Sequence, residues 1–128
     1  MAALTSPRNT PRRDNPQVRE PVAAARILQG ALVVLEAGAA KPGKTATGLI
    51  ALGVAEETAE IGDRARTRAG TFRFDNSAAA DAIAATEIGK TAYIVDDHTV
   101  AKTDGTGTRS AAGTVFDVDA QGVWVKVG

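Results

Sequence analysis

The chain has 128 residues, 15 basic (Lys and Arg) against 15 acidic (Asp and Glu) side chains, and no cysteine. This length fits one domain, and a net charge of zero excludes a global attraction to nucleic acid or anionic lipid. The lack of cysteine excludes disulfides and thiolate metal sites, and no run approaches the roughly 20 apolar residues that span a bilayer. We therefore expect a soluble protein, made in the cytoplasm, that has neither a nucleic-acid partner nor a membrane partner.

The N-terminal stretch is rich in proline and arginine. Four of the five prolines lie within the first 21 residues, at intervals of four or five positions. Proline removes a backbone donor, fixes its own φ and pushes the preceding residue toward extended geometry, so this stretch cannot be a helix. Its four arginines outnumber Asp14 and Glu20, giving a net charge of about +2 and leaving about −2 on the remainder.

We interpret residues 1–21 as an extended arm that becomes ordered against another chain, with a disordered tail as the alternative. The residues expected to bind the partner are Leu4, Thr5, Pro7, Arg8, Asn9, Thr10, Pro11, Arg12 and Arg13.

Residues 22–128 form the predicted domain, in which short β-prone runs alternate with glycine-containing turns. This spacing is typical of an all-β meander or barrel. The expected strands are 26–29, 31–36, 49–55, 67–74, 91–95, 99–102, 113–118 and 123–127. One helix is expected over 78–87, because Asn76 or Ser77 can cap it and Gly89 follows as a stop signal. The predicted fold is mainly β: a small β-barrel or β-tulip-like meander with one short helix and the arm.

The segment from Gly38 to Thr45 reads GAAKPGKT and matches the phosphate-loop pattern G-x-x-x-x-G-K-T. In such a loop the amides cradle phosphate, the lysine reaches the terminal phosphates and the threonine holds magnesium at the start of a helix. The required helix would contain Gly48 and Gly53, and the chain lacks the crossovers of a doubly wound sheet. A glycine-rich turn is the preferred interpretation, and a small phosphate-loop-like nucleotide-binding protein stays as an alternative.

His98, the only histidine, lies beside Asp96 and Asp97. Imidazole and carboxylates serve as general bases and metal ligands, but aspartates are also ordinary turn residues. We predict no catalytic residue, no metal and no cofactor, and therefore no enzyme.

A further set of residues is predicted as a possible interface: Arg64, Arg66, Arg68 and Trp124. The arginines alternate along one run, and they either meet an acidic partner or form a solvated strand face. The single tryptophan either anchors a partner or, as is commoner, fills the core.

Several segments together carry a resemblance: residues 3–11, residues 30–33, residues 72–77 with Asp81, and residues 88–97 followed by Val100, Gly113 and residues 123–125. In their order along almost the whole chain they resemble capsid decoration (cement) proteins of tailed bacteriophages and Mu-like prophages.

The resemblance implies a small β-rich body, commonly trimeric, at three-fold positions on the outside of the head. It also implies an arm that reaches across neighbouring subunits and a role in stiffening the expanded shell. The hypothesis is a structural virion protein on the outer capsid surface, with the major capsid protein and its own copies as partners. A generic protein-binding adaptor domain is the third alternative.

Overall fold

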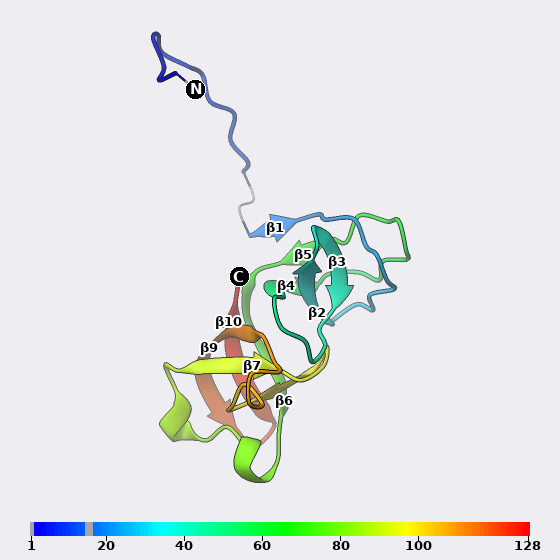
Figure 1. Cartoon of the computed structure of the whole chain (residues 1–128), viewed down its shortest axis with the longest axis vertical. Coiled ribbons are helices and arrows are strands. Elements are labelled where there is room, and N and C mark those ends of the chain that lie inside the picture. The colour runs from blue at the N-terminus through cyan, green and yellow to red at the C-terminus, as the bar shows by residue number, and fades with distance from the viewer. Residues whose placement is uncertain (1, 15–16) are drawn as a thin grey trace.

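A computed structural model describes residues 2–14 and 17–128 of the chain, which form two sheets joined side by side (Figure 1). The strands are β1 (Val18–Arg19), β2 (Leu32–Glu36), β3 (Ala39–Pro42), β4 (Ile50–Ala55), β5 (Thr67–Arg68), β6 (Gly70–Asn76), β7 (Thr91–Ile94), β8 (Thr99–Ala101), β9 (Ala111–Asp119) and β10 (Gly122–Val127). Two short 3₁₀ turns, η1 (Ala79–Asp81) and η2 (Ala85–Glu87), are the helical elements in this part of the chain.

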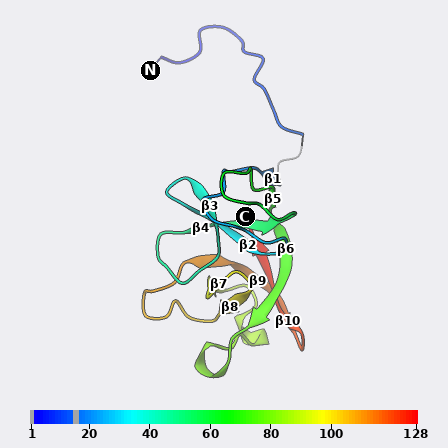
Figure 2. The ribbon, with the colours of Figure 1, turned by 90° about the vertical axis from the view of Figure 1, so that its right-hand side faces the viewer.

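The first sheet has the strand order β1-β5-β4-β2-β3, and the second closes into a barrel with the order β10-β6-β8-β7-β9. The mainly β fold with a small barrel is therefore confirmed. The predicted strand 67–74 is divided at Ala69, because the chain passes there from β5 in the first sheet to β6 in the barrel. Figure 2 shows β6 leading from the region of β5 into the barrel.

Strand β2 supplies side chains to both cores. Leu32 and Val34 pack in the barrel core, whereas Val33 between them packs in the core of the first sheet. Successive side chains of a strand point to opposite faces, so the apolar run of β2 is buried on both sides. All three are 0% exposed, and each buried side chain of this kind contributes about 1.5–3 kcal/mol before ordering entropy is subtracted.

The helix predicted over residues 78–87 is wrong. The segment contains only η1 and η2, neither of which buries a residue, and Ala79 has a φ of 55° that an α-helix does not allow. The Asn76 side chain accepts a hydrogen bond from the Ile83 amide and donates one to the Ile83 carbonyl, each at 2.8 Å. Alanine propensity alone is a weak force, and without an apolar stripe these side-chain bonds prevail.

The predicted strand 26–29 is also wrong, since Ile27 makes only an isolated bridge to Ala59 although its side chain is fully buried. Conversely, β3 was not expected. The other predicted strands correspond to β2, β4, β7, β8, β9 and β10. Neither 3₁₀ turn, nor any other helical stretch in the described ranges, has the length and apolar character of a membrane span.

Candidate functional site

Residues 2–14 form an extended segment without regular secondary structure, and every one of them is exposed. All nine predicted partner-binding residues of the arm lie here, including Leu4, whose side chain is 74% exposed. Figures 1 and 2 both show the segment extending away from the two sheets. Pro16, which also belongs to the predicted arm, lies with Met1 and Asn15 outside the described residues. The segment therefore presents its apolar and basic side chains outward.

The last part of the predicted arm is built into the first sheet. Val18 and Arg19 of β1 pair with Arg68 and Thr67 of β5, and the Val18 side chain is only 8% exposed. Backbone bonds on either side extend this contact: the Ala69 amide donates to the Gln17 carbonyl at 2.8 Å, and the Ala65 amide donates to the Pro21 carbonyl at 2.7 Å. We call residues 17–128 the body, and the extended segment leaves it from a fixed base.

Arginines of the predicted interface hold the base of the extended segment in place through hydrogen bonds and ion pairs. Arg64 Nη1 donates to the Glu20 carbonyl at 3.2 Å, and Arg66 Nη1 lies 3.2 Å from Glu20 Oε1. Glu56 accepts from Arg66 Nε at 3.2 Å and from Arg68 Nε. Partial burial raises the pKa of Glu56, but the bonds from Arg68 and Arg66 outweigh it and leave that pKa below its ordinary value. Arg66 and Arg68 thus carry paired charges, and their predicted role in binding a partner stays a prediction.

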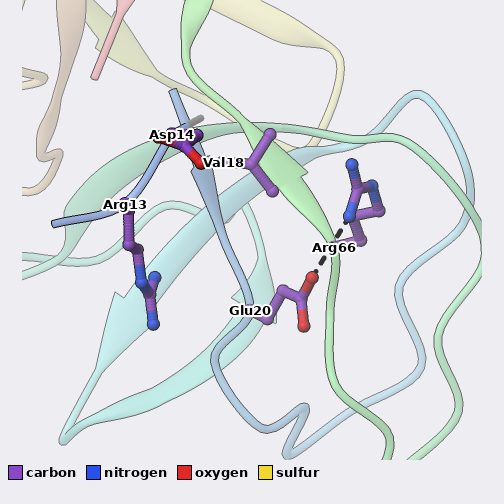
Figure 3. A pocket seen from close by; sticks show the side chains of 5 residues that line it. All are labelled: Arg13, Asp14, Val18, Glu20 and Arg66. Carbon is purple, nitrogen blue, oxygen red and sulfur yellow. Dashed lines mark hydrogen bonds and ion pairs between the residues drawn. The ribbon is translucent and has the colours of Figure 1, made fainter. Parts of the chain in front are cut away.

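An open hollow of about 370 Å³ lies where the extended segment meets the body. It is lined by Arg13, Asp14, Val18, Glu20 and Arg66, and Figure 3 shows the Arg66–Glu20 ion pair on one side of it. Because the segment itself forms part of the lining, the hollow marks the point where the arm departs.

The segment that matches the phosphate loop folds as a hairpin strand. Ala37 and Gly38, with φ values of 50° and 81°, form the turn between β2 and β3, as expected for a tight hairpin. Lys44 Nζ lies 2.9 Å from Glu36 Oε1, and the Thr45 hydroxyl donates to the Val95 carbonyl at 2.8 Å. The groups that would bind phosphate and magnesium are therefore engaged within the protein, and residues 46–49 are not helical.

Calorimetric titration with magnesium ATP is accordingly expected to show no binding at micromolar concentrations. The chain and its Lys44→Ala variant should give the same heats as buffer. Micromolar binding that Lys44→Ala abolishes would contradict the assignment of this segment to a hairpin and favour the nucleotide-binding alternative.

His98 is held between carboxylates on the barrel surface. Its Nδ1 lies 2.9 Å from Asp75 Oδ2 and its Nε2 lies 3.5 Å from Asp96 Oδ1. The hydrogen bond to Asp75 and then the charge of Asp96 raise the pKa of His98. Ligand atoms of Asp96, Asp97 and His98 lie within 4.8 Å of one another, and the absence of a metal stays a prediction. His98 bridges Asp75 of β6 and Asp96 in the turn before β8.

Trp124 lies half-buried on the outer face of β10, outside the buried core cluster of the barrel. Val123, Val125 and Val127 point inward and are at most 1% exposed, which turns Trp124 outward by strand alternation. Its Nε1 donates to Asp119 Oδ2 at 2.9 Å, and the Arg73 guanidinium lies 5.8 Å from the ring centroid. This bond and the amide of Gln121 lower the pKa of Asp119. Trp124 keeps an accessible face that suits the interface role predicted for it.

Two exposed apolar side chains on strands escaped the sequence analysis. Phe116 of β9 is 65% exposed and Ile50 of β4 is 58% exposed. Phe116 lies where the β9–β10 register shifts, and a bulge turns a side chain outward without any mark in the sequence pattern.

Comparison of the chain with protein-family models, with curated proteins and with solved structures found no match. The geometry described above and the resemblance of the sequence are therefore the basis for a functional proposal.

Proposed function

We propose that this protein is a structural decoration protein, which binds the outside of a phage head and cements the lattice of the major capsid protein. The proposal makes it a non-enzymatic component of the virion surface, active as a homotrimer at three-fold positions. The observation that carries it is the exposed, basic, proline-interrupted segment of residues 2–14 on a fixed base. The resemblance of the sequence to decoration proteins supplies the identity of the partner.

The chemistry of the extended segment supports binding to a protein surface. Arg8, Arg12 and Arg13 are exposed. Within the described residues they form one ion pair, from Arg12 Nε to Asp14 Oδ1 at 3.7 Å, and both of its side chains are almost fully solvated. Such a pair contributes little and is readily exchanged for a partner carboxylate. Prolines also reduce the conformational entropy that the segment loses on binding, which favours affinity.

The body supports a mechanical role. The second sheet closes into a barrel, and a closed barrel has no open strand edge of its own. Because β1 is paired into the first sheet, force on the extended segment is passed to the body through backbone hydrogen bonds. Many copies on one lattice would turn weak individual contacts into firm attachment.

A generic adaptor domain would also explain the extended segment, but no observation favours it over the capsid-binding proposal. An adaptor should bind a cellular protein and ignore purified capsids, whereas a decoration protein should bind the capsids.

Co-sedimentation with DNA-filled heads of the phage or prophage that encodes the chain tests the proposal. We expect saturable binding with a fixed ratio of this protein to major capsid protein. Recovery of the protein in the supernatant at concentrations that saturate any specific site would reject the proposed function.

A further inference from the structure

The turn of residues 95–98, between β7 and β8, connects the barrel to the first sheet. The Asp97 carbonyl accepts a hydrogen bond at 2.8 Å from the amide of Leu32, the first residue of β2. The Val95 carbonyl accepts a second bond at 2.8 Å, from the Thr45 hydroxyl. We call residues 95–98 the junction turn, because its backbone joins a barrel loop to residues of and near the first sheet.

The His98 side chain fixes the junction turn to β6. Its Nδ1 lies 2.9 Å from Asp75 Oδ2 on β6, and its Nε2 lies 3.5 Å from Asp96 Oδ1 within the turn. The backbone follows the same path, since the Asp75 amide donates to the His98 carbonyl at 2.7 Å. Each ring nitrogen therefore faces a carboxylate oxygen, and only the protonated ring carries a hydrogen on both nitrogens.

The charges around this ring are of one sign. The carboxylates of Asp75, Asp96 and Asp97 raise the pKa of His98, with the hydrogen bond to Asp75 as the largest cause and the charge of Asp96 next. Residues 28–31, which line a hollow together with Asp97 and His98, are uncharged. Loss of the ring proton therefore leaves three carboxylates around a neutral imidazole, and like charges that lie close together repel one another.

We propose that His98 is a pH-sensitive contact, which holds the junction turn in place while its ring is protonated and loosens the turn when the proton is lost. Because the pKa of His98 in the folded chain is raised above its ordinary value of 6.5, the stabilisation is fully present below that value. It is lost as the pH rises through the folded pKa. The inference concerns the body alone, and its test requires no capsid.

Hydrogen exchange of the Leu32 amide tests the contact, because this amide is released when the junction turn moves. Exchange is followed by NMR at about pH 6 and about pH 8.5, on either side of the titration, with EDTA present to remove metal ions. The comparison variant is His98→Gln, which keeps a polar side chain and does not titrate. The ring and Asp75 are 65% and 68% exposed, so the effect is that of a solvated ion pair.

After correction for intrinsic exchange, protection of Leu32 should fall between the two pH values about two- to fivefold more in the unmodified chain than in His98→Gln. The Ala23 amide, which donates to the Asp63 carbonyl in the first sheet, should show the smaller change. Equal pH dependence of Leu32 protection in the two proteins, or an equal change at Leu32 and Ala23, would overturn the inference.

Titration of the single histidine by NMR provides a second measurement. The midpoint should lie above 6.5 in the unmodified chain and should fall in Asp75→Asn, which removes the largest cause of the raised pKa. A midpoint at or below 6.5, or one that Asp75→Asn leaves unchanged, would show that the carboxylates do not hold the protonated ring and would also overturn the inference.

Discussion

Deletion of residues 2–14 is expected to weaken binding to DNA-filled heads at least about tenfold, or about 1.4 kcal/mol, without lowering the melting temperature of the body. The affinity falls because the deleted residues carry the exposed basic side chains and Leu4. The body stays folded because β1 and its hydrogen bonds to Ala65 and Ala69 lie beyond the deletion. Quantitative co-sedimentation and calorimetric melting measure the two quantities.

The position of the cut matters. Extending the deletion to residue 20 also removes Val18 and the carboxylate that pairs with Arg66, so this longer deletion should lower the melting temperature. A matched variant that keeps residues 2–14 but changes Arg8, Arg12 and Arg13 to glutamine separates charge from backbone contacts. If the protein lacking residues 2–14 still occupied the heads fully, the claim that the extended segment binds the capsid would be contradicted.

The largest loss of stability from a single methyl group is expected at Gly53, where Gly53→Ala should destabilise the body by about 3 kcal/mol or more. Gly53 has a φ of 151°, which alanine rarely adopts, and an added β-carbon would overlap the carbonyl of Arg68. That carbonyl belongs to the β5 strand against which β1 is paired, so the clash cannot be relieved without moving the base of the arm. Urea denaturation followed by the fluorescence of Trp124 measures the free energy of unfolding.

Two other glycines serve as controls that separate backbone strain from steric overlap in the destabilisation expected for Gly53→Ala. Gly62 has a φ of 92° and open space where alanine would place its β-carbon, so Gly62→Ala should cost only about 1–2 kcal/mol of backbone strain. At Gly113 no positive φ is involved, but a β-carbon would overlap the Lys126 carbonyl, so Gly113→Ala isolates the clash. If Gly53→Ala were no more destabilising than Gly62→Ala, the close contact between β4 and β5 would be contradicted.

Strands that combine β-branched residues with flanking turn signals could be predicted from the sequence. β10 is an example, with alternating valines after the turn that ends at Gly122. Strand β3 could not be predicted, because alanine, lysine and proline are poor strand formers and the pairing with β2 is imposed by the Ala37–Gly38 turn. The expected helix failed for the opposite reason, since alanines with good propensity had no apolar face to bury.

Some features of the candidate site could likewise be predicted from the sequence, and others could not. Proline spacing and arginines identified the extended segment because their effects on the backbone are local. The contacts of Glu20 and Glu56 with Arg66 join positions 46 and 10 residues apart, and such pairing depends on strand order, which local patterns do not determine.

Electron cryomicroscopy of DNA-filled heads bound by this protein tests the central claim most directly. The account predicts density for the body outside the shell at three-fold positions, with the segment of residues 2–14 lying against neighbouring chains. Heads whose outer surface lacks such density, or bound bodies whose first residues stay free in solvent, would contradict it.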